Sequence, residues 1–126
     1  MSLHLMIDNI FHLPDNRNLS YCLYGPGDGK PVLYFHGTPS SRLEPSLLAA
    51  YSIDIYELLF KYKLQLIAMN RPGMGLSTFN PAGDFTSFAK DVRNLLQDLK
   101  IKQCKVLCWS GGGPFVLMRW QINIKR

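Results

Sequence analysis

The sequence predicts an α/β fold in which a β-hairpin is followed by alternating helices and mostly parallel strands. Two short apolar runs, 10–14 and 19–25, flank the polar turn 15–18, which is a hairpin pattern. Continuous apolar runs at 32–35 and 64–69 then alternate with helical patterns. Strands that alternate with helices indicate a mostly parallel sheet with helices on both faces.

The later strands are expected to be buried on both faces. The run 32–35 ends at His36-Gly37, and its continuous apolar character is typical of a central parallel strand. The run 64–69 has the same character, and 71–75 must be a loop because one proline and two glycines interrupt it. Residues 105–109 are expected to form the last strand.

Two of the expected helices lie in the first half of the chain. Residues 40–51 can begin a helix, with Pro45 accepted only near its start, and 54–63 continues helically. A further helix is expected from Gly111, where Pro114 falls in the first turn and its missing N–H does no harm.

Residues 84–100 form the clearest predicted helix. Asp84 or Thr86 can cap its start, and Lys100 suits its C-terminal end. Its apolar residues recur at three- and four-residue steps and so share one stripe: Phe85, Phe88, Val92, Leu95, Leu96 and Leu99.

Composition excludes several classes of protein. The 126 residues are 47% hydrophobic and 18% charged, which predicts a single globular domain over 1–126. The net charge is +5, but no cluster of Lys and Arg with aromatic platforms indicates a nucleic-acid partner. No apolar run reaches the roughly 18 residues that a membrane span needs. The first 11 residues lack the basic start of a signal peptide.

Three cysteines, Cys22, Cys104 and Cys108, lie in apolar runs. An odd number in such positions predicts buried free thiols in a reducing compartment, and hence a cytoplasmic location. No Cys/His pair has zinc spacing, so neither a metal nor another cofactor is expected.

The turn at Ser110 carries the strongest chemical signal. The stretch 108–114 reads CWSGGGP, a strand end followed by a serine and a glycine-rich helix start. A tight strand-to-helix turn exposes a serine hydroxyl at the carboxyl end of a sheet, and small residues such as Gly112 permit it. The alternatives are a turn that only allows close packing, or one that binds an anion. A dinucleotide fingerprint is excluded because Val116 occupies its third glycine position.

A second segment can complete an oxyanion hole, the pair of N–H groups that stabilises the negative oxygen formed during acyl transfer. Residues 36–39 read HGTP and follow the first central strand. Such a hole takes one N–H from the residue after the nucleophile and one from this loop. Pro39 has no N–H, so Thr38 and Gly111 are the expected pair.

Other charged and titratable residues near these motifs are expected to be structural. His36 is interpreted as a residue that fixes its loop by hydrogen bonding, rather than as the general base. His4 and His12 are expected on the surface or in a strand. Arg71 could bind an anionic substrate, but pairing with a carboxylate is favoured.

Together these segments resemble the α/β-hydrolase superfamily. The matching stretches are HGTPSSR at 36–42, RPGMGLS at 71–77 and WSGGGP at 109–114, and the first hairpin is also similar. The resemblance implies that Ser110 is the nucleophile, with Thr38 and Gly111 around the oxyanion. A serine nucleophile resembles the esterase, lipase and peptidase branches and differs from the epoxide hydrolases and dehalogenases.

The sequence departs from that family after Ser110. The triad order in this fold is serine, then an acid, then histidine, yet no Asp, Glu or His follows Ser110. The chain is therefore expected to be the N-terminal half of an α/β-hydrolase fold, truncated at its C-terminus. The strand 105–109 would then form an apolar sheet edge, through which self-association is expected.

The expected function is hydrolysis of a small-molecule ester or related acyl compound by Ser110, incomplete without a triad acid and histidine. Two alternatives are an inert fragment and a non-enzymatic module that binds a partner on the hydrolase scaffold. The substrate itself is not indicated by any residue pattern.

Overall fold

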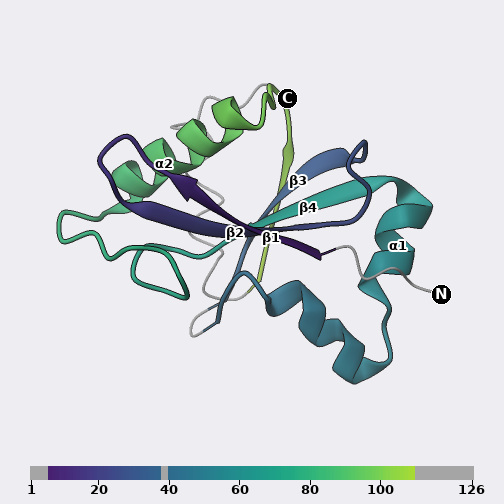
Figure 1. Cartoon of the computed structure of the whole chain (residues 1–126). Helices are drawn as coiled ribbons and strands as arrows, with labels where there is room; N and C mark the ends of the chain where they lie inside the picture. Colours follow the sequence, from purple (N-terminus) through teal and green to yellow (C-terminus); the bar gives the residue numbers. More distant parts are fainter. Residues whose placement is uncertain (1–5, 38–39, 110–126) are drawn as a thin grey trace.

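The computed structural model describes residues 6–37 and 40–109, without the side chain of residue 48, and Figure 1 traces them. Five strands form one sheet in the order β1-β2-β4-β3-β5. The strands are β1 (Met6–His12), β2 (Asn18–Tyr24), β3 (Lys30–Phe35), β4 (Leu64–Met69) and β5 (Lys105–Cys108). The helices are the 3₁₀ helix η1 (Glu44–Tyr51), α1 (Ile55–Tyr62) and α2 (Phe85–Asp98).

The sheet is mixed. β2 pairs antiparallel with β1 and β4, whereas β3 pairs parallel with both β4 and β5. The crossovers from β3 to β4 and from β4 to β5 contain the helices, as parallel neighbours require. The predicted class, a hairpin followed by alternating helices and mostly parallel strands, is confirmed.

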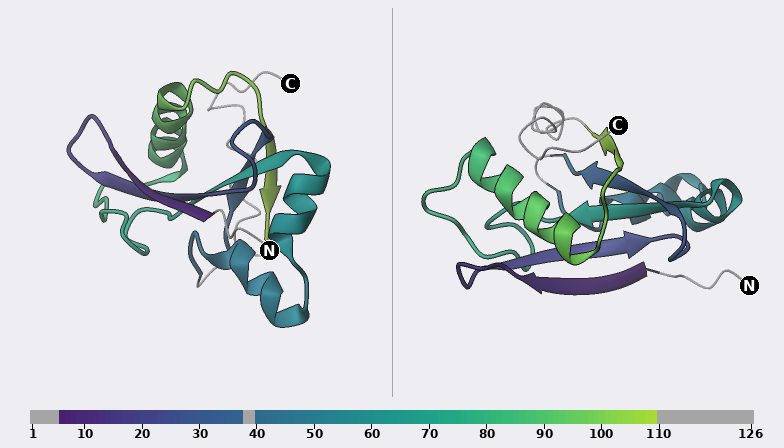
Figure 2. Two further views of the ribbon diagram at one scale, coloured as in Figure 1. Left: turned by 45° about the vertical axis from the view of Figure 1, so that its right-hand side comes forward. Right: turned by 90° about the horizontal axis from the view of Figure 1, so that it is seen from above.

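The two faces of the sheet carry separate cores because side chains alternate along each strand. Leu33, Phe35, Ile67 and Met69 face α2 and contact its buried stripe, which includes Val92. Their sequence neighbours point to the other face, where Leu59 of α1 covers them. Figure 2 shows α2 on one side of the sheet with η1 and α1 on the other.

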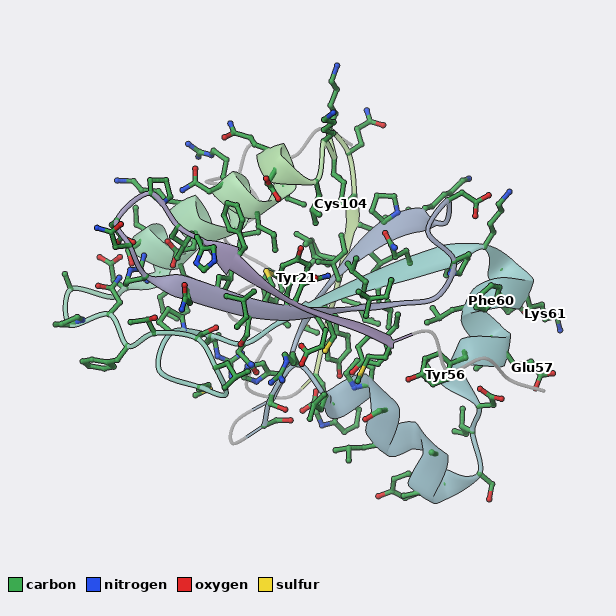
Figure 3. The ribbon with its side chains drawn as sticks, viewed as in Figure 1. Tyr21, Tyr56, Glu57, Phe60, Lys61 and Cys104 are labelled. Carbon is green, nitrogen blue, oxygen red and sulfur yellow. The ribbon has the colours of Figure 1, made fainter. Side chains whose placement is uncertain are left out.

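α1 covers its face of the sheet with one side only. Asp54 caps its start by accepting bonds from the N–H groups of Tyr56 and Glu57 at 3.0 and 3.2 Å. Tyr56 turns toward the sheet, where its ring lies 6.1 Å from that of Tyr24, while Glu57 and Lys61 extend outward (Figure 3). This division is the amphipathic pattern of a surface helix.

Element bounds agree closely with the predictions where the core decides them. β4 matches its predicted range exactly, and α2 begins after the predicted Asp84 cap, whose side chain accepts from Ser87 N–H at 2.7 Å. β1 begins at Met6, four residues before the predicted start at Ile10. Its side chains are mostly exposed, so backbone pairing with β2, not an apolar pattern, defines the strand.

The segment 40–51 was expected to be helical from its start, and the structure corrects this. Only Glu44–Tyr51 is helical, as a 3₁₀ helix, after a turn at 42–43. The Ser46 hydroxyl and N–H both bond to the Leu43 carbonyl, at 2.5 and 3.0 Å, which favours a tight i+3 turn over an α-helical one.

All three cysteines are free, as predicted, and their burial differs. Cys22 is fully buried, whereas Cys104 and Cys108 are partly buried. Burial raises the pKa of the Cys22 and Cys104 thiols to about 11, so both remain protonated and unreactive at neutral pH. None of the helices over the described ranges is long and apolar enough to cross a bilayer.

Candidate active site

The carboxyl ends of β3, β4 and β5 meet at one edge of the sheet. Phe35 of β3 lies opposite Met69 of β4 and Cys108 of β5 in the parallel register. Trp109 N–H continues the ladder by donating to the Phe35 carbonyl at 3.2 Å. Ligands of open α/β sheets bind at this edge, so the segments after these strands form the candidate active site.

The predicted nucleophile and oxyanion residues follow these strands directly. Ser110 comes after Trp109, and Thr38 comes after Gly37. Ser110, Gly111 and Thr38 all lie outside the described residues, so their roles remain predictions. The described residues Gly37 and Trp109 lie next to each other, since a Cβ atom added to Gly37 would lie 3.2 Å from Cδ1 of Trp109. The two loops are therefore adjacent up to the last residue described in each.

His36 is fully buried and both of its ring nitrogens are occupied. Nδ1 lies 2.6 Å from the Gly37 carbonyl, and Nε2 lies 3.4 Å from the Arg71 N–H. A carbonyl only accepts, so Nδ1 carries the proton and Nε2 is the acceptor, which makes the ring neutral. This confirms the structural interpretation of His36, because a general base needs a free nitrogen near the nucleophile.

Arg71 bonds to backbone oxygens of the loop after β3. Its guanidinium donates to the His36 carbonyl from Nη1 at 2.6 Å and to the Gly37 carbonyl from Nη2 at 3.0 Å. Burial lowers the pKa of Arg71, and the charge of Glu44 acts in the opposite direction. These two bonds go to the backbone, the Glu44 carboxylate acts on Arg71 through its charge, and direct pairing with a carboxylate stays a prediction.

Glu44 holds the other side of Gly37, and no sequence pattern indicated this. The Gly37 N–H donates to the two Glu44 carboxylate oxygens at 3.0 and 3.2 Å. The Tyr34 hydroxyl donates to Oε1 of Glu44 at 2.5 Å, and burial together with Glu44 raises the pKa of Tyr34. The one feature of the sequence that could have pointed to this contact is that Glu44 is an acid near the start of an expected helix.

A buried polar network ties together the loops after β3 and β4. The Asn70 side chain accepts from the Arg42 N–H at 2.7 Å and donates to the Ser20 hydroxyl at 2.6 Å. The Ser77 hydroxyl donates to the Asn70 carbonyl at 2.8 Å and accepts from Ser20 N–H at 3.0 Å. Since all four residues are buried, these bonds fix the loops firmly relative to each other.

Beside this network lies an open hollow of about 410 Å³ between the loop after β4 and the start of α2. Its apolar lining comes from Pro72 and three phenylalanines, and its polar lining includes Arg71 and Asp84. The phenylalanines are Phe79, Phe85 and Phe88. No group of three or more His, Cys, Asp or Glu side chains within 6–37 and 40–109 could hold a metal ion.

The buried state of His36 predicts a pH effect on stability. Burial lowers the pKa of His36, so the folded protein takes up a proton less readily than the unfolded chain. Its stabilising contribution is complete above the unfolded pKa of about 6.5 and is lost as the pH falls toward the lower folded value. We expect the free energy of unfolding to decrease over this range more steeply in wild type than in His36→Asn.

The asparagine amide keeps a donor for the Gly37 carbonyl but does not titrate. The difference between the two proteins therefore gives the contribution of His36 protonation to the pH dependence of stability. Denaturant titrations at several pH values give both slopes. Burial raises the pKa of Asp91, but Asp91 is present in both proteins and cancels in the difference. Equal slopes for the two proteins would contradict a buried neutral His36.

Comparison with known proteins places this geometry in a family. The sequence model of the alpha/beta hydrolase fold matches residues 30–119. The chain is 33% identical over 101 residues to the non-heme chloroperoxidase of Streptomyces lividans, covering 79% of this chain and 34% of that protein. It is 30% identical over 94 residues to the serine hydrolase-like protein of Danio rerio, covering 72% and 26% respectively.

Solved structures agree. The epoxide hydrolase CorEH superposes with a TM-score of 0.72 at 20% identity, over 94% of this chain and 39% of that one, which shows a shared fold. The chain thus spans about a third of the length of the proteins that it matches. Because the family model matches residues 30–119, the chain belongs to the alpha/beta hydrolase fold family.

Proposed function

We propose that this chain supplies the nucleophile and the oxyanion hole of a serine hydrolase that acts on an ester or related acyl compound. The observation that carries the proposal is the junction of β5 with β3. Trp109 donates a hydrogen bond to the Phe35 carbonyl and lies next to Gly37, so Ser110 and Thr38 follow two adjacent residues. That is the arrangement in which a nucleophile turn and an oxyanion loop face one substrate carbonyl.

The proposed chemistry is acyl transfer. The Ser110 oxygen attacks the substrate carbonyl carbon as its proton passes to a general base, and the carbonyl oxygen becomes negative. The Thr38 and Gly111 N–H groups donate to that oxygen. Collapse of the tetrahedral intermediate expels the alcohol, which takes up a proton, and leaves an acyl-serine that water then hydrolyses.

Neither His36 nor His12, the two histidines that the structure describes, can act as the general base. His36 is buried with both nitrogens bonded, and the His12 ring lies beside Asn18 at the end of β1. The residues after Ser110 include no acid or histidine. In this fold the acid and the histidine follow the serine, so a full catalytic rate requires two partners that the residues after Ser110 do not supply. An oxyanion hole without a working triad still accelerates hydrolysis by roughly 10³- to 10⁴-fold over water.

Hydrolysis of p-nitrophenyl acetate by the purified chain tests the proposal. We expect a rate above the spontaneous one that Ser110→Ala lowers and that Ser41→Ala, the matched serine control, retains. Equal rates for wild type and Ser110→Ala would contradict the nucleophile assignment and favour the inert fragment. The three free cysteines suit a reducing compartment, so we propose a cytoplasmic location and assays with a reductant.

The position of β5 as the outermost strand of the sheet favours a second candidate function, in which the chain pairs with another copy of itself through that strand. Within the described ranges β5 bonds to β3 alone, and Leu107 and Trp109 are 49% and 65% exposed. An exposed apolar edge strand is a template for strand addition. Sedimentation velocity should give a dimer for wild type and a monomer for Leu107→Lys, and a monomeric wild type would contradict this candidate.

A further inference from the structure

The Gly37 carbonyl oxygen accepts hydrogen bonds from two side chains. Arg71 Nη2 donates to the Gly37 oxygen at 3.0 Å, and His36 Nδ1 donates to the same oxygen at 2.6 Å. Arg71 Nη1 meanwhile donates to the preceding carbonyl, that of His36, at 2.6 Å. One guanidinium therefore spans two successive carbonyl groups of the loop after β3.

The Gly37 N–H is also bonded, and side chains crowd the side of Gly37 where another residue would carry its Cβ. Glu44 accepts the Gly37 N–H at 3.0 and 3.2 Å, and Tyr34 holds that carboxylate by a 2.5 Å bond. A Cβ on Gly37 would lie 3.3 Å from Oε2 of Glu44 and 3.2 Å from Trp109, so little space remains for the residue to move. The carbonyl of Gly37 consequently has one defined direction.

That direction matters because a peptide group is planar and almost always trans. The N–H of a trans peptide points opposite to its C=O, so a donor that fixes the carbonyl also fixes the amide hydrogen. We propose that Arg71 is a positioning residue that sets the direction of the residue-38 N–H toward the substrate oxyanion. This inference rests on the proposed function, in which Thr38 supplies one of the two oxyanion donors.

An arginine suits this task better than a lysine. Arg71 is only 6% exposed, and the planar guanidinium presents its donors in a rigid fork that reaches two oxygens at once. The residue is itself fixed, because Asn70 before it lies in the buried network and its own N–H bonds to His36 Nε2 at 3.4 Å. A lysine ammonium is a point donor on a flexible stem and would hold one carbonyl less firmly.

Nuclear magnetic resonance of the full chain tests the positioning directly. In Arg71→Met we expect the Gly37 carbonyl carbon to move upfield, and the residue-38 amide to shift with it. Arg42→Met is the matched control, since Arg42 is 9% exposed at the same end of the sheet but bonds to Asp8. Arg71→Lys repeats the test with a variant that retains the positive charge if Arg71→Met fails to fold.

The inference is overturned if a folded Arg71 variant leaves the Gly37 carbonyl and residue-38 amide signals no more altered than Arg42→Met does. The kinetic readout is p-nitrophenyl acetate hydrolysis, where Arg71→Met should lower kcat by roughly 10- to 100-fold with little change in KM. An unchanged kcat would overturn it as well. If wild type hydrolyses no faster than Ser110→Ala, the proposed function fails, and the resonance signals alone then decide whether Arg71 positions the peptide.

Discussion

Replacing Gly75 with alanine is expected to lower the free energy of unfolding by about 4 kcal/mol. Gly75 has a φ of +52°, a left-handed conformation that costs a non-glycine residue roughly 1–2 kcal/mol. Its new Cβ would also lie 2.6 Å from Cγ of Asn70, which must then move. Asn70 would lose its bonds to Arg42 and Ser20, and each buried group left unpaired costs about 1–3 kcal/mol.

Gly27→Ala is the matched control for this change. No heavy atom lies within 4 Å of a Cβ built on Gly27, and its φ is not positive. Its free energy of unfolding should therefore stay within about 1 kcal/mol of wild type, or rise slightly because alanine restricts the unfolded chain. Denaturant titration of both variants measures the difference. A Gly75→Ala variant as stable as Gly27→Ala would show that the Asn70 network does not hold the site loops.

The second large effect is expected for Asp91→Ala, which should cost about 3 kcal/mol of folding free energy. Asp91 accepts two bonds from the Arg17 guanidinium, at 2.7 and 3.1 Å, and so ties α2 to the hairpin turn. Burial raises the pKa of the Asp91 carboxyl, while the Arg17 bonds act to lower it. Its removal leaves a largely buried guanidinium without two of its acceptor oxygens, which is the costly way to break such a pair.

Asp15→Ala removes the other carboxylate from the same guanidinium and is the control. Asp15 bonds to Arg17 Nε at 2.7 Å, but its side chain is 57% exposed, so its loss should lower the free energy of unfolding far less than the loss of Asp91. Thermal or denaturant unfolding of the two variants compares a buried and an exposed partner of one arginine. Equal losses would mean that burial of Asp91 adds nothing to the pair.

The parts of the fold that sequence predicts well are those with a local hydrophobic signal. β4 is a continuous apolar run, and α2 carries an apolar stripe at helical spacing, so both could be placed within a residue or two. β1 was placed too short because Asp8 and Asn9 interrupt its apolar character. Its place in the sheet is decided by pairing with β2 and by the Asp8–Arg42 ion pair, neither of which is local.

The candidate site likewise contains residues that a local motif predicts and contacts that no local pattern indicates. Ser110, Thr38 and Gly111 were predicted from short motifs, and they stay predictions because they lie outside the described residues. The structural role of His36 was predicted because a general base must lie within hydrogen-bond reach of the nucleophile, and it is confirmed. The contacts of Arg71 with the loop after β3 join residues 34 and 35 positions apart, and the Asn70–Ser20 bond spans 50 positions. No periodic pattern marks such pairs, so only the folded chain reveals them.

The most direct test of the account is covalent labelling of Ser110 by a fluorophosphonate, which reacts with nucleophilic serines, in a buffer that contains imidazole as an external general base. The purified full chain is incubated with the probe, digested, and mapped by mass spectrometry beside Ser110→Ala. The account predicts that the modification falls on the peptide containing Ser110 and disappears in the variant, while Ser41 and the other serines stay unmodified. A folded wild-type chain that takes up no probe at Ser110 would contradict the assignment of Ser110 as a hydrolase nucleophile.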